Sequence, residues 1–200
     1  DKNLVFVDMI LTASKRAADL TSKLLAFGRK SKIVNTTINI NSVLDDALSI
    51  FKHTIDKQIV ISIEKNAENS SVIGDNSLLL NSILNLGINS SHAMIGGGNL
   101  FLSTRNVTLN ENYCKNSPFD LKSGEFIDIE VRDTGTGIDQ EDIKHIFEPF
   151  FTTKKEGKGT GLGLATIYGA IQEHHGAITV YSEIGVGTSF HLLIPCSEEK

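Results

Sequence analysis

The chain has 200 residues, of which 40% are hydrophobic, and a net charge of -5. This content suffices for one complete core plus an appendage, and no apolar run is long enough to span a bilayer. Residues 1–33 hold seven Lys/Arg against three Asp, so the remaining residues carry a net charge of -9. The acidity of this larger part argues against a nucleic-acid partner. Cys114 and Cys196 lie far apart and belong to no Cys/His cluster with the spacing of metal ligands, so we expect both to be free thiols. Free thiols indicate a reducing compartment, so we expect a cytoplasmic location, whether or not the full-length protein is anchored to a membrane.

The first 33 residues are predicted to form one long helix. Apolar side chains recur there at alternating steps of four and three, with no Gly or Pro before Gly28. The seam consists of Phe6, Ile10, Ala13, Ala17, Leu20, Leu24 and Phe27. It either packs on its own globular domain or belongs to a helical hairpin or dimeric bundle whose other helix precedes Asp1. The narrow seam ahead of a separate domain favours the bundle, so we divide the chain into residues 1–33 and 34–200.

Strands and helices alternate through the second part. Strands are predicted at residues 37–40, 58–64, 72–74, 100–107, 126–133, 177–182 and 188–195, and helices at 41–55, 77–93 and from 164 onward. Asn41 is the expected N-cap of the first of these helices, and the polar segment 110–124 is expected to be a loop. This order predicts an α/β fold, a two-layer sandwich in which three helices cover one face of a mixed sheet.

A carboxylate at the end of one strand is the first candidate for binding. Asp133 has the parity of the apolar residues 127, 129 and 131, so it is expected to point toward the core, where an unpaired charge is costly. Gly135 and Gly137 leave room beside it for a flat ligand. An exocyclic amine on that ligand would satisfy the carboxylate.

Two further patterns indicate phosphate and metal. The glycine cluster 157–163 opens an apolar-periodic helix, where backbone N–H groups and the helix dipole favour an anion such as a phosphate chain. On the helix 77–93, a polar stripe of Asn81, Asn85, Asn89 and His92 lies beside the core side, which includes Ser90. Amide oxygens suit Mg²⁺, which takes further ligands from phosphates and water.

Four segments, in this order, resemble the motifs of sensor histidine kinases. They are the asparagine box at residues 85–93, the first glycine box at 133–137, the phenylalanine box at 146–154 and the second glycine box at 159–164. The stretch 16–30 is similar to the second helix of that family's dimerisation and histidine-phosphotransfer hairpin. The resemblance implies a catalytic domain of the GHKL type with a Bergerat-type ATP-binding fold, which binds ATP or ADP together with Mg²⁺.

The resemblance also implies roles for individual residues. Asp133 would accept from the adenine amine, with Thr188 as a water-mediated helper, while Asn89 and Asn85 would hold Mg²⁺ and His92 would take the place of a basic phosphate-contacting residue. Lys154 and Lys158 would lie in the nucleotide lid, where they either reach the terminal phosphate or are simply solvated. The other implied nucleotide contacts are Gly135, Gly137, Ile138, Gly159, Thr160, Gly161, Leu162, Gly163 and Leu164.

The phosphoacceptor is expected outside this chain. None of the six histidines forms the H-[DE] pair that the family carries on the first hairpin helix. The resemblance therefore implies a protein histidine kinase fragment that passes the γ-phosphoryl group to a histidine on the missing helix and onward to an aspartate of a response regulator receiver domain, within a homodimer formed by the hairpin. Two alternatives stay open: a nucleotide-sensing module without kinase turnover, and another GHKL ATPase such as a topoisomerase, chaperone or mismatch-repair domain, which the long helix and phenylalanine box disfavour.

Overall fold

The computed structural model describes residues 6, 7, 14, 36–154 and 159–197. The predicted helix at 1–33 therefore lies almost wholly outside the described residues, and its assignment to a hairpin stays a prediction. No helix in the described part of the chain combines the length and apolar character needed to cross a membrane.

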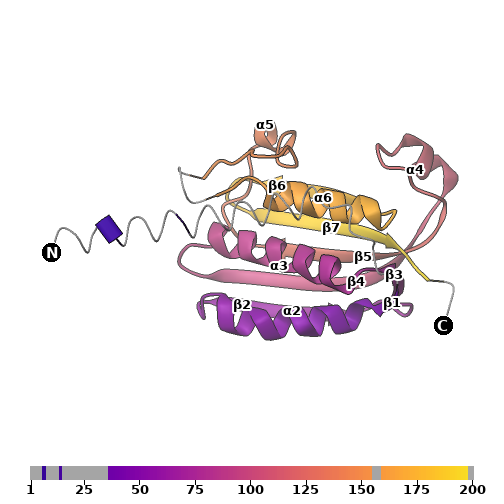
Figure 1. The fold of residues 1–200 in the computed structure, drawn as a ribbon, viewed down its shortest axis with the longest axis horizontal. Helices are drawn as coiled ribbons and strands as arrows, with labels where there is room; N and C mark the ends of the chain where they lie inside the picture. The colour runs from indigo at the N-terminus through magenta and orange to yellow at the C-terminus, as the bar shows by residue number, and fades with distance from the viewer. Residues whose placement is uncertain (1–5, 8–13, 15–35, 155–158, 198–200) are drawn as a thin grey trace.

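A five-stranded mixed sheet forms one layer (Figure 1). Its order is β2-β4-β5-β7-β6, in which β2 pairs with β4 in parallel and the other neighbours are antiparallel. The bounds are β2 (Ile59–Lys65), β4 (Gly98–Leu109), β5 (Gly124–Asp133), β6 (Ala177–Glu183) and β7 (Gly187–Pro195). A second, two-stranded antiparallel sheet joins β1 (Thr36–Asn39) to β3 (Ser71–Gly74).

Three helices cover one face of the larger sheet. They are α2 (Ile40–Thr54), α3 (Asn76–Ala93) and α6 (Gly163–Glu173), with α3 packed between the other two (Figure 1). Each turns an apolar stripe toward the alternate side chains of β4, β5 and β7, and these residues form one continuous buried core. The predicted fold class, three helices on one face of a mixed sheet, is confirmed.

Two local predictions were wrong. The segment 110–124, expected to be a loop, contains the short helix α4 (Glu111–Asn116), which the side chain of Asn110 caps. The N-cap of α2 is Asn39, whose Oδ1 accepts from the backbone N–H of Asn41 at 2.9 Å. The side chain of Asn41 instead accepts from the Thr104 hydroxyl at 3.1 Å. A second short helix, α5 (Gln140–Ile143), follows β5.

The face of the sheet opposite the three helices carries an ion-pair network around a buried acid. Asp128 on β5 is only 3% exposed and accepts from Arg105 Nη2 at 2.8 Å and Nε at 3.0 Å. The imidazole Nδ1 of His191 lies 3.0 Å from the other carboxylate oxygen of Asp128. The alternation in residues 126–133 indicated a polar outer face there, but this acid is shielded from water by its partners.

Candidate nucleotide site

Asp133 ends β5 on the helix-covered side of the sheet, as predicted. Its carboxylate is 4% exposed and accepts from the Ser90 hydroxyl at 2.7 Å and from the Gly135 backbone N–H at 2.9 Å. Ser90 belongs to α3, so this bond fixes the end of β5 against the helix that carries the asparagine box. Both donors are neutral, which leaves the negative charge of the carboxylate uncompensated among its described partners.

The asparagine box faces a cationic side chain. The ammonium of Lys154, in the phenylalanine box, donates to Asn89 Oδ1 at 3.3 Å and to His92 Nδ1 at 3.0 Å. Asn89 therefore already directs its amide oxygen at a positive charge, which is the arrangement that a Mg²⁺ ligand requires. Asn85 lies one turn earlier on the same stripe and is half-buried.

Burial and charge weaken the basicity of this pair. Burial, followed by the neighbouring charge of Lys154, lowers the pKa of His92 below 6.5. Burial also lowers the pKa of Lys154 below 10.5. Both effects favour the uncharged form of His92, whose Nδ1 can then accept from Lys154.

The second glycine box lies beside Asn89 at the start of α6. A Cβ added to Gly163 would lie 3.9 Å from Asn89 Nδ2, which places the N-terminus of α6 next to the predicted metal ligand. Gly161 has φ +65°, and a side chain there would collide with the backbone of Phe150. The Phe150 N–H donates to the Gly161 carbonyl at 2.9 Å. The phenylalanine and second glycine boxes thus form one packed unit.

The first glycine box is held against the turn between β6 and β7. Gly137 has φ +74°, and a Cβ there would lie 2.1 Å from the Glu183 carbonyl oxygen. The next residue, Ile138, donates its N–H to Ser182 Oγ at 2.8 Å, and Ser182 Oγ lies 2.8 Å from Thr188 Oγ1. Thr188 is buried opposite Asp133 in the β5–β7 register, so the two predicted adenine-side residues are neighbours.

Most of the predicted residues are thus brought together around the ends of α3, β5 and α6. Lys158 lies outside the described residues, while Gly159 lies against Thr152 and Lys154. Leu162 is 1% exposed and Leu164 packs against the core. Their side chains are therefore structural, and any contact that they make with a phosphate has to come from the backbone.

Two serines at the site were not predicted. Ser90 holds Asp133 and Ser182 links Ile138 to Thr188. The role of Ser90 could have been inferred from the sequence, because Ser90 interrupts the apolar stripe of the helix 77–93 and a buried hydroxyl needs a hydrogen-bond partner. Ser182 stands in a strand with no comparable pattern.

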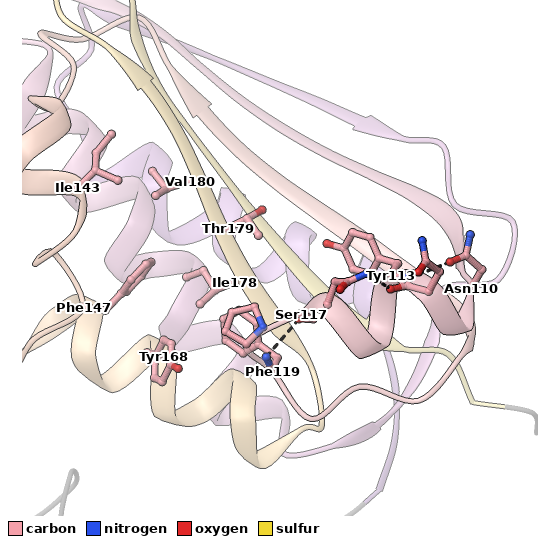
Figure 2. Close-up of a pocket in the computed structure, with 13 residues that line it drawn as sticks. Asn110, Tyr113, Ser117, Phe119, Ile143, Phe147, Tyr168, Ile178, Thr179 and Val180 are labelled. Carbon is pink, nitrogen blue, oxygen red and sulfur yellow. Dashed lines mark hydrogen bonds between the residues drawn. The ribbon is translucent and has the colours of Figure 1, made fainter.

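A cavity of about 800 Å³ is lined by a different set of residues (Figure 2). It opens between the segment around α4, the strand β6 and α6, and Figure 2 shows Phe119 and Tyr168 on adjoining walls. The ring centroids of these two residues are 5.5 Å apart. None of the predicted nucleotide residues lines it, but Ile143 and Val180 also line a second cavity, of about 480 Å³, to which Asp133 and Thr188 contribute.

Comparisons with known proteins agree with this geometry. A model of the family described as "Histidine kinase-, DNA gyrase B-, and HSP90-like ATPase" matches residues 74–198. The chain is 37% identical over 182 residues to the Sensor kinase CckA of Brucella abortus, which covers 91% of this chain and 19% of that protein. It is 29% identical over 200 residues to Sporulation kinase C of Bacillus subtilis, covering 97% and 42%. The chain therefore spans less than half the length of these relatives.

Solved structures show the same architecture. The catalytic domain of histidine kinase ThkA superposes with a TM-score of 0.64 at 26% identity, over 81% of this chain and 97% of that one. ShkA in complex with AMPPNP has a TM-score of 0.75 at 19% identity, over 98% and 39%, which shows a shared fold. With the family model covering more than half of its residues, this chain belongs to the histidine kinase-, DNA gyrase B- and HSP90-like ATPases.

Proposed function

We propose that the domain binds Mg-ATP between α3 and the phenylalanine box and offers the γ-phosphoryl group to a histidine outside this chain. The observation that carries the proposal is the position of Asn89, whose amide oxygen accepts from the Lys154 ammonium while its amide nitrogen lies beside the N-terminus of α6. The amide of Asn89, the ammonium of Lys154 and the N-terminus of α6 thus meet at one point. The Ser90–Asp133 bond fixes the carboxylate for the adenine amine against the same helix.

The residues present fit the implied groups. Asp133 would accept from the adenine amine, and Asn89 with Asn85 would hold Mg²⁺, which when bound neutralises charge on the phosphates. The second glycine box would donate backbone N–H groups to the phosphate chain. Lys154 is within reach of the same point and would supply a further positive charge.

Phosphoryl transfer requires little covalent chemistry from the protein. Positioning and charge neutralisation account for most of the catalysis, and a neutral imidazole on the acceptor is already a nucleophile. The domain's task would then be to present the terminal phosphate. The phosphohistidine would pass its phosphate to a receiver-domain aspartate, a step supported by the fold that this chain shares with a solved histidine kinase, ThkA, in complex with its response regulator TrrA. In the full-length protein, the hairpin whose second helix residues 1–33 would form would supply the dimer contact.

A transfer experiment tests the catalytic role. The chain is mixed with ATP labelled on the γ-phosphate and with a separate polypeptide that carries the first hairpin helix and its histidine. Label on that polypeptide that is stable in alkali and lost in acid supports the kinase. Tight nucleotide binding without transfer would instead support a nucleotide-sensing module.

Titration calorimetry with ATP and ADP, each with and without Mg²⁺, tests the metal assignment. The variant Asn89→Ala should lose the Mg²⁺-dependent part of the affinity and keep most of the metal-free ADP binding. Asn81→Ala is the matched control, because Asn81 lies on the same stripe two turns earlier and is exposed. Equal losses with and without metal would remove Asn89 from the proposed coordination sphere.

A further inference from the structure

His174 is the C-cap of α6 and is 4% exposed. It is not one of the residues assigned to the candidate nucleotide site. Both ring nitrogens are engaged. Nδ1 lies 2.6 Å from the Ala170 carbonyl oxygen, and Nε2 lies 2.9 Å from the backbone nitrogen of Asp75. Because a carbonyl only accepts and an amide N–H only donates, these neighbours fix the tautomer with its proton on Nδ1.

The partner of this ring is the residue that begins α3. Asp75 is the N-cap, and its Oδ1 accepts from the N–H groups of Ser77 at 2.8 Å and Leu78 at 3.1 Å. The ring reaches it only because Gly74 has no side chain: a Cβ there would lie 2.1 Å from His174 Cδ2. The imidazole therefore ties the C-terminal end of α6 to the start of α3.

The other ends of the same two helices form the candidate site. Asn89 and Gly163 are neighbours there, so α3 and α6 run side by side in opposite directions (Figure 1). At about 1.5 Å per residue, Asp75 lies roughly 21 Å from Asn89 along α3, and His174 lies roughly 16 Å from Gly163 along α6. A slide or rotation at the His174 end would be carried by two rigid helices to the metal and phosphate groups.

We propose that His174 is a positioning residue that sets the asparagine box against the second glycine box from the far end of the helix pair. The proposal rests on the proposed nucleotide function, since it concerns the alignment of the same two groups. His174 lies at the opposite end of the helix pair from Asn89 and Gly163. It acts through the Asp75 amide and the length of α3.

Two substitutions separate this role from bulk packing. His174→Leu keeps most of the volume but leaves the Asp75 N–H without its acceptor, whereas His174→Gln places an amide oxygen near the position of Nε2. Leu109→Ala is the matched control for lost stability, because Leu109 packs in a separate apolar cluster with Leu121, Phe126 and Leu193. Thermal unfolding of each variant is recorded beside calorimetric titration of Mg-ATP and of metal-free ADP.

We expect His174→Leu to weaken Mg-ATP binding by about 10-fold, because misalignment remote from a site is transmitted to it. The loss of metal-free ADP affinity should be smaller, since Asn89 acts through the metal. His174→Gln should recover most of the affinity, and Leu109→Ala should lower the melting temperature while its affinity stays that of the wild type.

Equal Mg-ATP affinity in His174→Leu and the wild type would overturn the positioning role, as would an equal loss in Leu109→Ala. If His174→Leu does not fold, His174→Asn replaces it: its amide can donate to the Ala170 carbonyl but is too short to reach Asp75. Affinity near the wild type in His174→Asn would then overturn the role, while a loss that His174→Gln does not show supports it. A wild-type chain that binds no nucleotide would overturn the proposed function itself.

Discussion

Strand β5 buries two carboxylates on opposite faces of one sheet, and their partners differ. Asp128 is 3% exposed and is paired with Arg105 and His191, whereas Asp133 is 4% exposed and is held by a hydroxyl and a backbone amide. A buried acid with cationic partners has its charge neutralised within the fold. A buried acid with neutral donors keeps an unneutralised charge that a ligand's amine can use. Burial alone therefore does not distinguish a binding carboxylate from a structural one. The charge of the groups that donate to the carboxylate does.

The largest expected effect is on the stability that Asp128 provides. Asp128→Ala removes the shared partner of Arg105 and His191, and we expect a loss of about 3 kcal/mol in the free energy of unfolding, at the low end for a broken buried pair because Arg105 is largely exposed. Urea unfolding measures it. Nucleotide affinity should stay that of the wild type, and a large fall in affinity would contradict the division between the two acids.

Asp133 should show the opposite pattern. Asp133→Asn keeps an oxygen for the Gly135 N–H but turns a donor toward the adenine amine, so we expect nucleotide affinity to fall by about 1–3 kcal/mol. Calorimetric titration gives the affinity, and the unfolding free energy should change little. An unchanged affinity would show that Asp133 does not contact the adenine.

The ion pair also predicts a pH dependence. The hydrogen bond to Asp128 raises the pKa of His191 against the opposing effect of burial, while the pKa of Asp128 is lowered because His191 and Arg105 outweigh its burial. The raised pKa of His191 gives stability that is full below pH 6.5 and is lost as the pH rises through the folded-state value. The lowered pKa of Asp128 gives stability that is full above pH 3.8 and is lost as the pH falls through its own folded-state value.

The substitution His191→Gln tests this pH dependence of stability. The difference in unfolding free energy between wild type and variant should be about 1 kcal/mol between pH 4 and 6.5 and should shrink toward pH 9. Urea unfolding across this pH range gives the profile. A difference that grows with pH would mean that the imidazole is not stabilised in its charged form by Asp128.

An effect similar in size to that of His191→Gln is expected near Asp133. Ser182→Ala removes the acceptor of the Ile138 N–H and the neighbour of Thr188, at a cost of about 0.5–1.5 kcal/mol in unfolding free energy. Nucleotide affinity should fall only slightly, because the first glycine box is also held by the backbone bond from the Gly185 N–H to the Thr136 carbonyl. An affinity loss as large as that of Asp133→Asn would make Ser182 part of the binding site.

The fold and the positions of Asp133 and the asparagine stripe were predictable because each rests on local periodicity. Alternation placed Asp133 on the core side of β5, and steps of three and four placed Asn85 and Asn89 on one stripe of α3. The same alternation failed for Asp128, because its burial depends on Arg105 from β4 and His191 from β7. The pattern of a single segment does not show which residues of neighbouring strands will lie beside it.

The remaining errors have the same origin. The cap of α2 went to Asn39 rather than Asn41 because both are good caps and the side chain of Asn41 is taken by Thr104, 63 residues away. The bond between Lys154 and Asn89 joins residues 65 apart, so the sequence indicated a positive charge in the expected lid but not its partner. The domain boundary at residue 33 and the role of Lys158 remain predictions.

The Ser90–Asp133 and Asn89–Lys154 bonds span 43 and 65 residues, so the pocket exists only in the fully assembled native state. No short peptide cut from the chain would retain it, and the denatured ensemble would have no competing affinity for nucleotide. Ligand binding would then stabilise the native state by about 4 kcal/mol when free ligand is a thousandfold above its dissociation constant. The ATP concentration around such a domain would set its lifetime as well as its activity.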